Sequence, residues 1–334
     1  MSLNFMSVKS KSEVVWEGVN WNEINTKFTK SFWDQNVRQF WVDEEIPLSG
    51  DKLVWQTRLN QFEKEVYVKV LGSLTLLDTH QGAIGMNRIC LSVPDLPTKA
   101  VLQFMAMMEQ MHAKSYSSIF CTLLTSEEIT ELFEWVKKEP TLQKKIEIVV
   151  SYYENIEDQE SLYMAMAASV FLESFLFYSG FFYMLYLSSQ GLMVNSGEII
   201  NLIIRDEAIH GLYIGTLASQ LFQTFSSAKQ EELKKKVYDL LELLMANEVQ
   251  YTEKIYSSLK LTDQVLKFLE YNANKALQNL DLDDRYKVTE KDINPMIFNG
   301  LNTSTKNHDF FSTKGNGYIK STNVENVQDE DFIF

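Results

Sequence analysis

Two short stretches of the sequence each carry an acid and an imidazole three residues apart. Glu109 and His112 occur in EQMHAKSY, and Glu207 and His210 occur in RDEAIHG. Residues i and i+3 of an α-helix lie on one face, so each pair can direct an oxygen and a nitrogen ligand toward one point. A single Glu-x-x-His pair is weak support for a metal site, because the same spacing also arises as a surface contact. Two pairs on separate apolar segments favour a metal site.

Two more carboxylates are isolated in apolar surroundings. Asp78 occurs in LGSLTLLDTHQG and Glu173 in SVFLESFLFYSG. Taken singly, each could be a buried acid that pairs with arginine, tyrosine or backbone, because an unpaired buried carboxylate is costly. Together with the two Glu-x-x-His pairs, they match the ligand pattern of di-iron and di-manganese carboxylate bundles. Four carboxylates and two imidazoles can neutralise and coordinate two divalent ions, either two Mn or two Fe.

Tyr116 shares a helix face with the first pair. Glu109, His112 and Tyr116 stand at i, i+3 and i+7, a stripe about 10 Å long. Their neighbours Met108 and Ile119 are apolar, so the stripe is expected to face the protein interior. A phenol beside an oxidised metal pair can lose an electron and a proton, and the resulting radical persists only where water is excluded. A tyrosine in an apolar helix is otherwise more often structural.

Three apolar residues are expected beside the metal site from their spacing to its acids. They could form a dry cage, and they are also ordinary core residues: Phe177, Phe181 and Ile203.

The segments that must position these residues have helical periodicity, and no β alternation of comparable strength appears. The predicted fold class is therefore all-α. The ligand pattern described above is typical of a ferritin-like helical bundle with a dinuclear metal site in its core. The expected helices span residues 54–89, 97–125, 127–137, 141–155, 159–188, 195–223, 227–258 and 262–280.

The chain has 334 residues, 45% of them hydrophobic, with only 5 prolines and 13 glycines. This favours one large helical domain, residues 1–285, which includes an irregular N-terminal arm, residues 1–50. Residues 286–334 are polar and rich in Asn and Gly, and we expect them to form a flexible tail. Its end, DEDFIF, is either a frayed terminus or a motif that docks a partner.

Charge and cysteine content exclude several classes of protein. The formal charge of −14 argues against a nucleic-acid-binding surface. Cys90 and Cys121 are isolated, which argues against a zinc site or redox pair and fits reduced thiols in a cytoplasmic protein. The first residues lack the apolar run of a signal peptide. Residues 161–188 could span a bilayer by length, but they lack a basic anchor, so we expect a buried central helix and no membrane.

The motifs LTLLDT, MEQMHAKSYSSIF, VFLESFLFYSGF and LIIRDEAIHG resemble those of a known family. The chain is similar to the small, radical-generating β subunit of class I ribonucleotide reductase, most closely the class Ib form, NrdF. The similarity extends from about residue 30 to 285, with a similar tail. The resemblance implies two metal ions, bridged by Glu109 and Glu207. The first would be bound by Asp78, Glu109 and His112, and the second by Glu173, Glu207 and His210.

The resemblance also implies a route for the oxidising equivalent. Tyr116 matches the family's radical tyrosine. Trp41 and Asp206 resemble the residues that connect a metal-bound histidine, here His112, to the subunit surface, and Tyr318 resembles a relay tyrosine in the tail. One tyrosine in a flexible tail means little by itself.

The implied function is to make a tyrosyl radical and pass it to a separate large subunit, which reduces ribonucleotides to deoxyribonucleotides. The implied partners are a second copy of the chain, that large subunit, and a flavodoxin-like activator when the metal is manganese. With only two cysteines, the chain lacks the cysteine trio of the large subunit. A stand-alone di-iron oxidase or desaturase, and a metal-storage bundle, are alternatives on the same fold, but Tyr116 and the tail argue against them.

Overall fold

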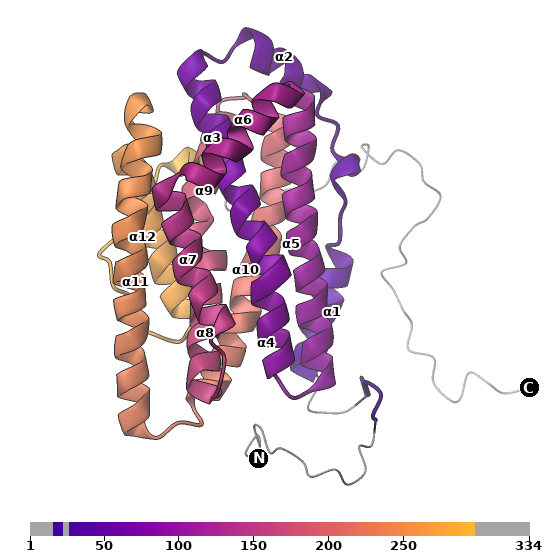
Figure 1. Ribbon diagram of the computed structural model, residues 1–334, viewed down its shortest axis with the longest axis vertical. Coiled ribbons are helices and arrows are strands. Elements are labelled where there is room, and N and C mark those ends of the chain that lie inside the picture. Colours follow the sequence, from indigo (N-terminus) through magenta and orange to yellow (C-terminus); the bar gives the residue numbers. More distant parts are fainter. Residues whose placement is uncertain (1–15, 23–26, 298–334) are drawn as a thin grey trace, which may run out of the picture. The chain divides into compact units, whose positions relative to one another are not determined.

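The computed structural model describes residues 16–22 and 27–297, which belong to one compact unit. These residues form helices and connecting loops with no β-strand, so the all-α prediction is confirmed (Figure 1). The α-helices are α1 (Lys27–Arg38), α2 (Ser49–Thr57), α3 (Gln61–His80), α4 (Met86–Ser92), α5 (Leu96–Leu123), α6 (Ser126–Lys138), α7 (Pro140–Glu154), α8 (Gln159–Phe171), α9 (Tyr178–Ser189), α10 (Val194–Phe222), α11 (Ser227–Tyr256) and α12 (Thr262–Asn279).

Two of the long helical rods contain a π-helical turn. Gln81–Gly85 joins α3 to α4, and Leu172–Leu176 joins α8 to α9. In a π turn the hydrogen bonds run from i to i+5, which inserts one extra residue and redirects the side chains; such turns are frequent at functional sites. The rods pack in pairs, α3 and α4 against α5, and α8 and α9 against α10, and α5 also contacts α10. These four rods enclose the centre of the bundle.

Six of the described α-helices begin at a side chain that caps the first free backbone N–H groups: α3, α5, α6, α7, α8 and α11. Asp95 and Thr125 accept hydrogen bonds from the backbone N–H three residues later, before α5 and α6. The predicted helix over 54–89 is wrong at its start, because it merges two helices. Asn60 forms a capping box with Glu63 and begins α3 after a break at residues 58–60.

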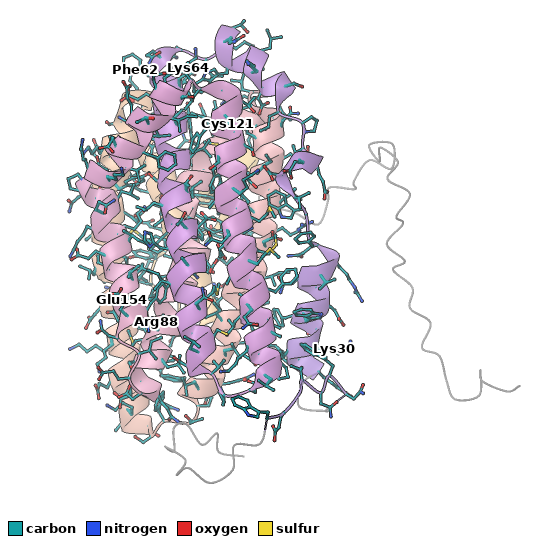
Figure 2. The ribbon with its side chains drawn as sticks, turned by 45° about the vertical axis from the view of Figure 1, so that its right-hand side comes forward. Lys30, Phe62, Lys64, Arg88, Cys121 and Glu154 are labelled. Atoms are coloured by element: carbon teal, nitrogen blue, oxygen red, sulfur yellow. The ribbon has the colours of Figure 1, made fainter. Side chains whose placement is uncertain are left out.

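The most apolar rod lies in the middle of the core. Gln159–Ser189 is the one described helix that is long and apolar enough to cross a membrane, and 94% of its apolar window is buried inside the protein. The prediction of a buried central helix is confirmed. Many charged side chains lie on the outside of the bundle, as Lys30, Arg88 and Glu154 do in Figure 2.

The chain stays packed beyond α12. Asn274 Oδ1 accepts hydrogen bonds from the backbone N–H groups of Arg285 and Tyr286. Val288, Ile293 and Ile297 then enter the hydrophobic core. The segment up to residue 297 therefore contributes buried apolar surface to the bundle.

Candidate metal centre

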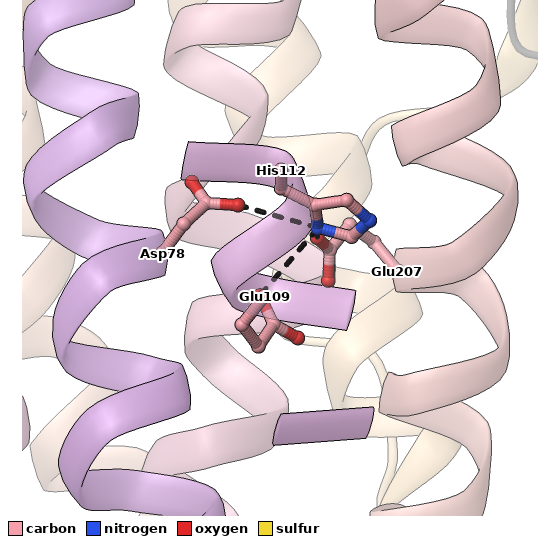
Figure 3. Close-up of side chains that lie close together, drawn as sticks. All are labelled: Asp78, Glu109, His112 and Glu207. Atoms are coloured by element: carbon pink, nitrogen blue, oxygen red, sulfur yellow. Dashed lines mark ion pairs between the residues drawn. The ribbon is translucent and has the colours of Figure 1, made fainter. Parts of the chain in front are cut away.

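Four helical rods each contribute to one buried cluster of acids and imidazoles. Asp78 comes from α3, Glu109 and His112 from α5, and Glu207 from α10, as Figure 3 shows. The other two members are Glu173, on the π turn between α8 and α9, and His210, one turn after Glu207. All six side chains are 0% exposed. The structure thus brings together every metal ligand predicted from the sequence.

The six side chains fall into two overlapping groups. Within each group the potential ligand atoms all lie within 4.8 Å of one another. The first group is Asp78, Glu109, His112 and Glu207, and the second is Glu109, Glu173, Glu207 and His210. Glu109 and Glu207 belong to both groups, which is the arrangement expected of carboxylates that bridge two ions.

The imidazole Nδ1 atoms point into this cluster. His112 Nδ1 lies 2.9 Å from a Glu207 oxygen and 3.3 Å from an Asp78 oxygen. His210 Nδ1 lies 2.7 Å from a Glu109 oxygen and 3.7 Å from Glu173 Oε2. None of these contacts has the geometry of a hydrogen bond, and both Nδ1 atoms lack a hydrogen-bond partner among the described residues.

Most carboxylate oxygens of the cluster also lack hydrogen-bond partners among the described residues. Among the described residues, neither oxygen of Asp78, Glu109 or Glu207 has a hydrogen-bond partner, nor does Oε2 of Glu173. Buried carboxylate oxygens without partners are costly. Two divalent cations would neutralise the four carboxylates and would take the free oxygen and nitrogen lone pairs. Hard oxygen donors with one imidazole per ion suit a pair of Mn or Fe ions, so the residues present fit a dinuclear centre.

The charges of the cluster perturb one another strongly. Burial raises the pKa of Asp78 and of Glu173 well above their usual values, and the neighbouring carboxylates add to this effect. Burial alone would lower the pKa of His112 and His210, but the surrounding carboxylates outweigh it and raise both. Without cations, the cluster therefore retains protons. Bound cations would replace them.

Tyr116 lies on α5 one turn after His112 and is 0% exposed. Burial raises the pKa of its phenol well above the usual value, and the negative charges of Asp78, Glu207 and Glu109 raise it further. The side chain is therefore a neutral phenol at physiological pH, and it lies close enough to the cluster for the carboxylate charges to affect its pKa. The three predicted cage residues are also 0% exposed: Phe177, Phe181 and Ile203.

A hydrogen-bonded path leaves the cluster through His112. Its Nε2 lies 3.2 Å from Asp206 Oδ2, and Trp41 Nε1 donates to the same oxygen at 2.7 Å. The Trp41 and His112 rings are stacked, with centroids 6.1 Å apart. A carboxylate that accepts from Nε2–H leaves Nδ1 as the lone-pair nitrogen, which is the tautomer that a metal ligand needs. Tyr318 lies outside the described residues.

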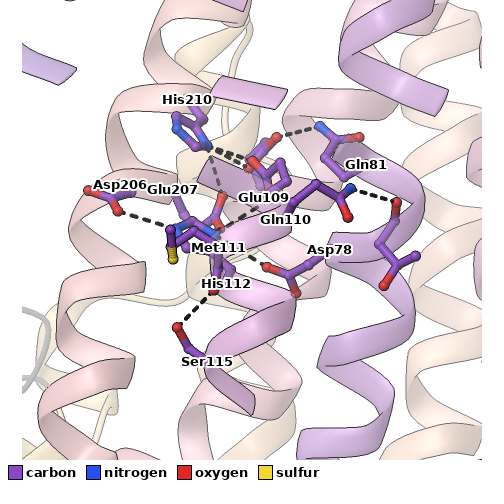
Figure 4. Close-up of polar contacts among 12 residues, drawn as sticks. Asp78, Gln81, Glu109, Gln110, Met111, His112, Ser115, Asp206, Glu207 and His210 are labelled. Atoms are coloured by element: carbon purple, nitrogen blue, oxygen red, sulfur yellow. Dashed lines mark hydrogen bonds and ion pairs between the residues drawn. The ribbon is translucent and has the colours of Figure 1, made fainter. Parts of the chain in front are cut away.

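Two glutamines that were not predicted as site residues lie beside predicted ones in the structure. Gln39 Nε2 donates to Asp206 Oδ1 at 2.9 Å, and Arg205 donates to the backbone oxygen of Gln39 at 2.6 Å. Gln81 donates to Glu173, and Figure 4 shows its amide at the edge of the polar network. One signal for Gln81 was available, because it stands three residues after Asp78 in a run of polar residues within an apolar helix.

Comparison with known proteins agrees with this geometry. The family model for the ribonucleotide reductase small chain matches residues 18–295. The ribonucleoside-diphosphate reductase β subunit of Bacillus phage SPbeta is 54% identical over 96% of this chain and 97% of its own length. The corresponding β subunit of Bacillus subtilis strain 168 is 53% identical over the same shares. These matches support the reductase prediction over a stand-alone oxidase.

A solved structure is similar as well. The crystal structure of dimanganese(II)-NrdF from Streptococcus sanguinis is 44% identical, with a TM-score of 0.83, over 86% of this chain and all of that chain. The predicted ferritin-like bundle with a dimetal site is confirmed. By sequence and by fold, the chain belongs to the ribonucleotide reductase small-chain family.

Proposed function

We propose that this chain is the radical-generating β subunit of a class Ib ribonucleoside-diphosphate reductase. It makes and stores a radical on Tyr116 and passes the oxidising equivalent to a large subunit, which reduces ribonucleotides to deoxyribonucleotides. One observation carries the proposal: the six predicted ligands converge in the core, and a neutral, fully buried phenol lies beside them.

The residues divide between two ions of Mn or Fe. Asp78 and His112 serve the first ion, Glu173 and His210 serve the second, and the two acids that belong to both groups bridge them. When bound and oxidised, the metal pair supplies the oxidising equivalent that takes one electron from a phenol. The surrounding apolar side chains keep water away from the centre.

Tyr116 gives up one electron and its phenolic proton and becomes a neutral radical. Because its pKa is raised, the proton stays on the oxygen until the electron leaves. Asp78 is the carboxylate whose charge acts most strongly on the phenol, and it is the nearby group able to hold the released proton. Exclusion of water then protects the radical from reductants.

Trp41, Asp206 and His112 form the exit for the oxidising equivalent. Asp206 keeps the indole N–H of Trp41 in a 2.7 Å hydrogen bond, so the proton of the indole has an acceptor when its electron moves. Gln39 occupies the other oxygen of Asp206 and fixes the carboxylate in place. Tyr318 continues the path in the tail.

Family membership supports two of the proposed partners, a second copy of the chain and a large subunit. The chain forms a homodimer and binds the large subunit through its C-terminal tail, residues 286–334, which ends in DEDFIF. A flavodoxin-like activator supplies the oxidant when manganese is bound. In this proposal the protein is cytoplasmic and binds neither nucleic acid nor a membrane.

A reconstitution experiment tests the proposal. The metal-loaded, activated chain is mixed with a purified class Ib large subunit, and the conversion of a ribonucleoside diphosphate to its deoxy form is measured. We expect turnover that requires both subunits. Deletion of residues 319–334 should leave the radical signal intact and weaken binding to the large subunit. Full activity of the chain without a large subunit would contradict the proposal.

A further inference from the structure

The carboxylate of Glu173 accepts a hydrogen bond from Gln81, which is itself held by Tyr153 of another helix. Gln81, at the π turn after α3, donates from Nε2 to Glu173 Oε1 and to Ser169 Oγ, the latter at 2.8 Å. The hydroxyl of Tyr153, on α7, donates to Gln81 Oε1 at 2.7 Å. Gln81, Tyr153 and Glu173 are all 0% exposed. The result is a buried chain of hydrogen bonds that runs from Tyr153 to the metal cluster.

These hydrogen bonds determine which end of the Gln81 amide faces Glu173. When cations are bound, Glu173 is an ionised carboxylate that only accepts hydrogen bonds, so the NH₂ group of Gln81 must face Glu173 and its carbonyl oxygen must face away. The Tyr153 hydroxyl occupies that carbonyl oxygen and prevents the amide from turning over. Burial raises the pKa of Tyr153 well above the usual value, so its hydroxyl stays protonated and remains a donor.

The backbone makes room for this contact at one glycine. A Cβ at Gly85, the last residue of the π turn, would collide with Gln81 Oε1 and would lie 2.7 and 2.9 Å from two ring carbons of Tyr153. The Tyr153 ring is rigid, so it cannot move aside as a flexible side-chain end could. A residue with a side chain at this position would force the Gln81 carbonyl and the phenol apart.

Glu173 differs in this respect from the other three acids of the cluster. Both oxygens of Asp78, Glu109 and Glu207 are without hydrogen-bond partners among the described residues, whereas Glu173 has one engaged oxygen and one free oxygen. The free Oε2 is the one that faces His210 Nδ1, at 3.7 Å. The asymmetry comes entirely from Gln81.

We infer that Gln81, locked by Tyr153, is a positioning residue that limits Glu173 to presenting one oxygen to the second metal ion. The inference rests on the proposed function, in which Glu173 is a ligand. A carboxylate with both oxygens free can change between one and two metal contacts. The Gln81 hydrogen bond opposes that change and thereby sets the affinity and the electronic environment of the second ion.

The test compares variants of the full chain loaded with Mn(II). Gln81→Met keeps the approximate length of the side chain and removes both donors. We expect it to bind two Mn(II) per chain, with the second bound about 10- to 100-fold more weakly, and with an altered dimanganese(II) electron paramagnetic resonance spectrum. Tyr153→Phe should shift both readouts in the same direction by a smaller amount.

Tyr163→Phe is the matched control. Tyr163 is also a buried tyrosine, 1% exposed, but its hydroxyl has no hydrogen-bond partner among the described residues. This variant should leave the spectrum and the affinity unchanged. A general loosening of the core would instead change the Mn(II) affinity and the spectrum in all three variants, and that result would overturn the inference.

The remaining outcomes separate the inference from the proposed function. A spectrum and second-ion affinity equal to wild type in Gln81→Met would overturn the inference and leave the proposed function intact. If Gln81→Met does not fold, Tyr153→Phe provides the test. A spectrum and second-ion affinity equal to wild type in Tyr153→Phe would then overturn the inference. A wild-type chain that binds two ions of neither Mn(II) nor Fe(II) would overturn the proposed function instead.

Discussion

Two clusters of charged side chains are buried in the bundle, and they differ in how their charge is balanced. Lys145 on α7 and Glu248 on α11 are 1% and 0% exposed and form a 2.5 Å ion pair. The Lys145 ammonium also lies 4.0 Å from the centre of the Tyr251 ring. The metal centre instead gathers four carboxylates and two imidazoles, and among the described residues no lysine or arginine forms an ion pair with its six ligands.

The difference separates a structural charge from a functional one. The Lys145–Glu248 pair supplies its own counter-ion, so it is complete in the folded chain. Within the part of the chain that the structure describes, the metal centre has no lysine or arginine counter-ion, so its buried acids depend on retained protons or bound cations, and cation binding stabilises the folded protein. A buried acidic cluster without cationic side chains is therefore a sign of a ligand, whereas a buried ion pair is not.

The largest expected effect separates the two clusters by metal content. Glu207→Ala should reduce bound metal from two ions per chain to nearly none, because Glu207 belongs to both ligand groups. Glu248→Ala should leave two ions per folded chain. Elemental analysis of both purified variants checks this. Full metal occupancy in Glu207→Ala would remove Glu207 from the ligand set.

The next effect concerns stability at the ion pair. Glu248→Ala should lower the free energy of unfolding by about 3–5 kcal/mol, because it leaves the Lys145 ammonium buried and unpaired. The double variant Lys145→Met, Glu248→Leu should recover most of the loss, because it removes both charges together. Urea unfolding of the metal-loaded proteins measures the difference. Equal stability of Glu248→Ala and wild type would show that the pair is not a buried charge in solution.

A smaller effect is stabilisation by added metal. At a free Mn(II) concentration of 100 times Kd, binding should raise the free energy of unfolding by about 2.7 kcal/mol for each ion. Thermal or urea unfolding with and without Mn(II) measures this rise. The Glu207→Ala variant serves as the control and should gain nothing. Equal stabilisation of both proteins would mean that the metal acts at some other place.

The smallest effect is the pH dependence of metal binding. Burial raises the pKa of Asp78 and Glu173 in the metal-free protein, so protons compete with cations for these oxygens. Metal affinity should fall as the pH decreases, by about 1.4 kcal/mol per pH unit for each proton displaced, and should level off above the raised pKa values. Calorimetry in buffers of different ionisation enthalpy counts the protons released. A pH-independent affinity would contradict the sign of these shifts.

The ligands of the metal centre were predictable because the pattern that indicates them lies within short stretches of sequence. The i, i+3 spacing puts Glu109 beside His112 and Glu207 beside His210 wherever the helices lie, and isolated acids in apolar segments need a partner. The family resemblance then indicated that Tyr116 is the radical tyrosine, which spacing alone cannot show.

Other features depend on contacts between distant segments, and the sequence did not reveal them. Lys145 lies in a predicted helix where its charge is typical of a solvated face, and its partner Glu248 is on another helix. Gln81 and Glu173 both lie on π turns, which periodicity does not predict, and their contact joins two separate rods. The break before α3 was missed because the Asn60 capping box lies inside a helical pattern.

The central claim is that the oxidising equivalent of this centre resides on Tyr116. Electron paramagnetic resonance of the activated Tyr116→Phe variant tests it most directly, with bound metal measured on the same sample and Tyr163→Phe as the buried-phenol control. The account predicts that Tyr116→Phe keeps two metal ions and has no tyrosyl radical signal, while Tyr163→Phe keeps both. An unchanged radical signal in Tyr116→Phe would contradict it.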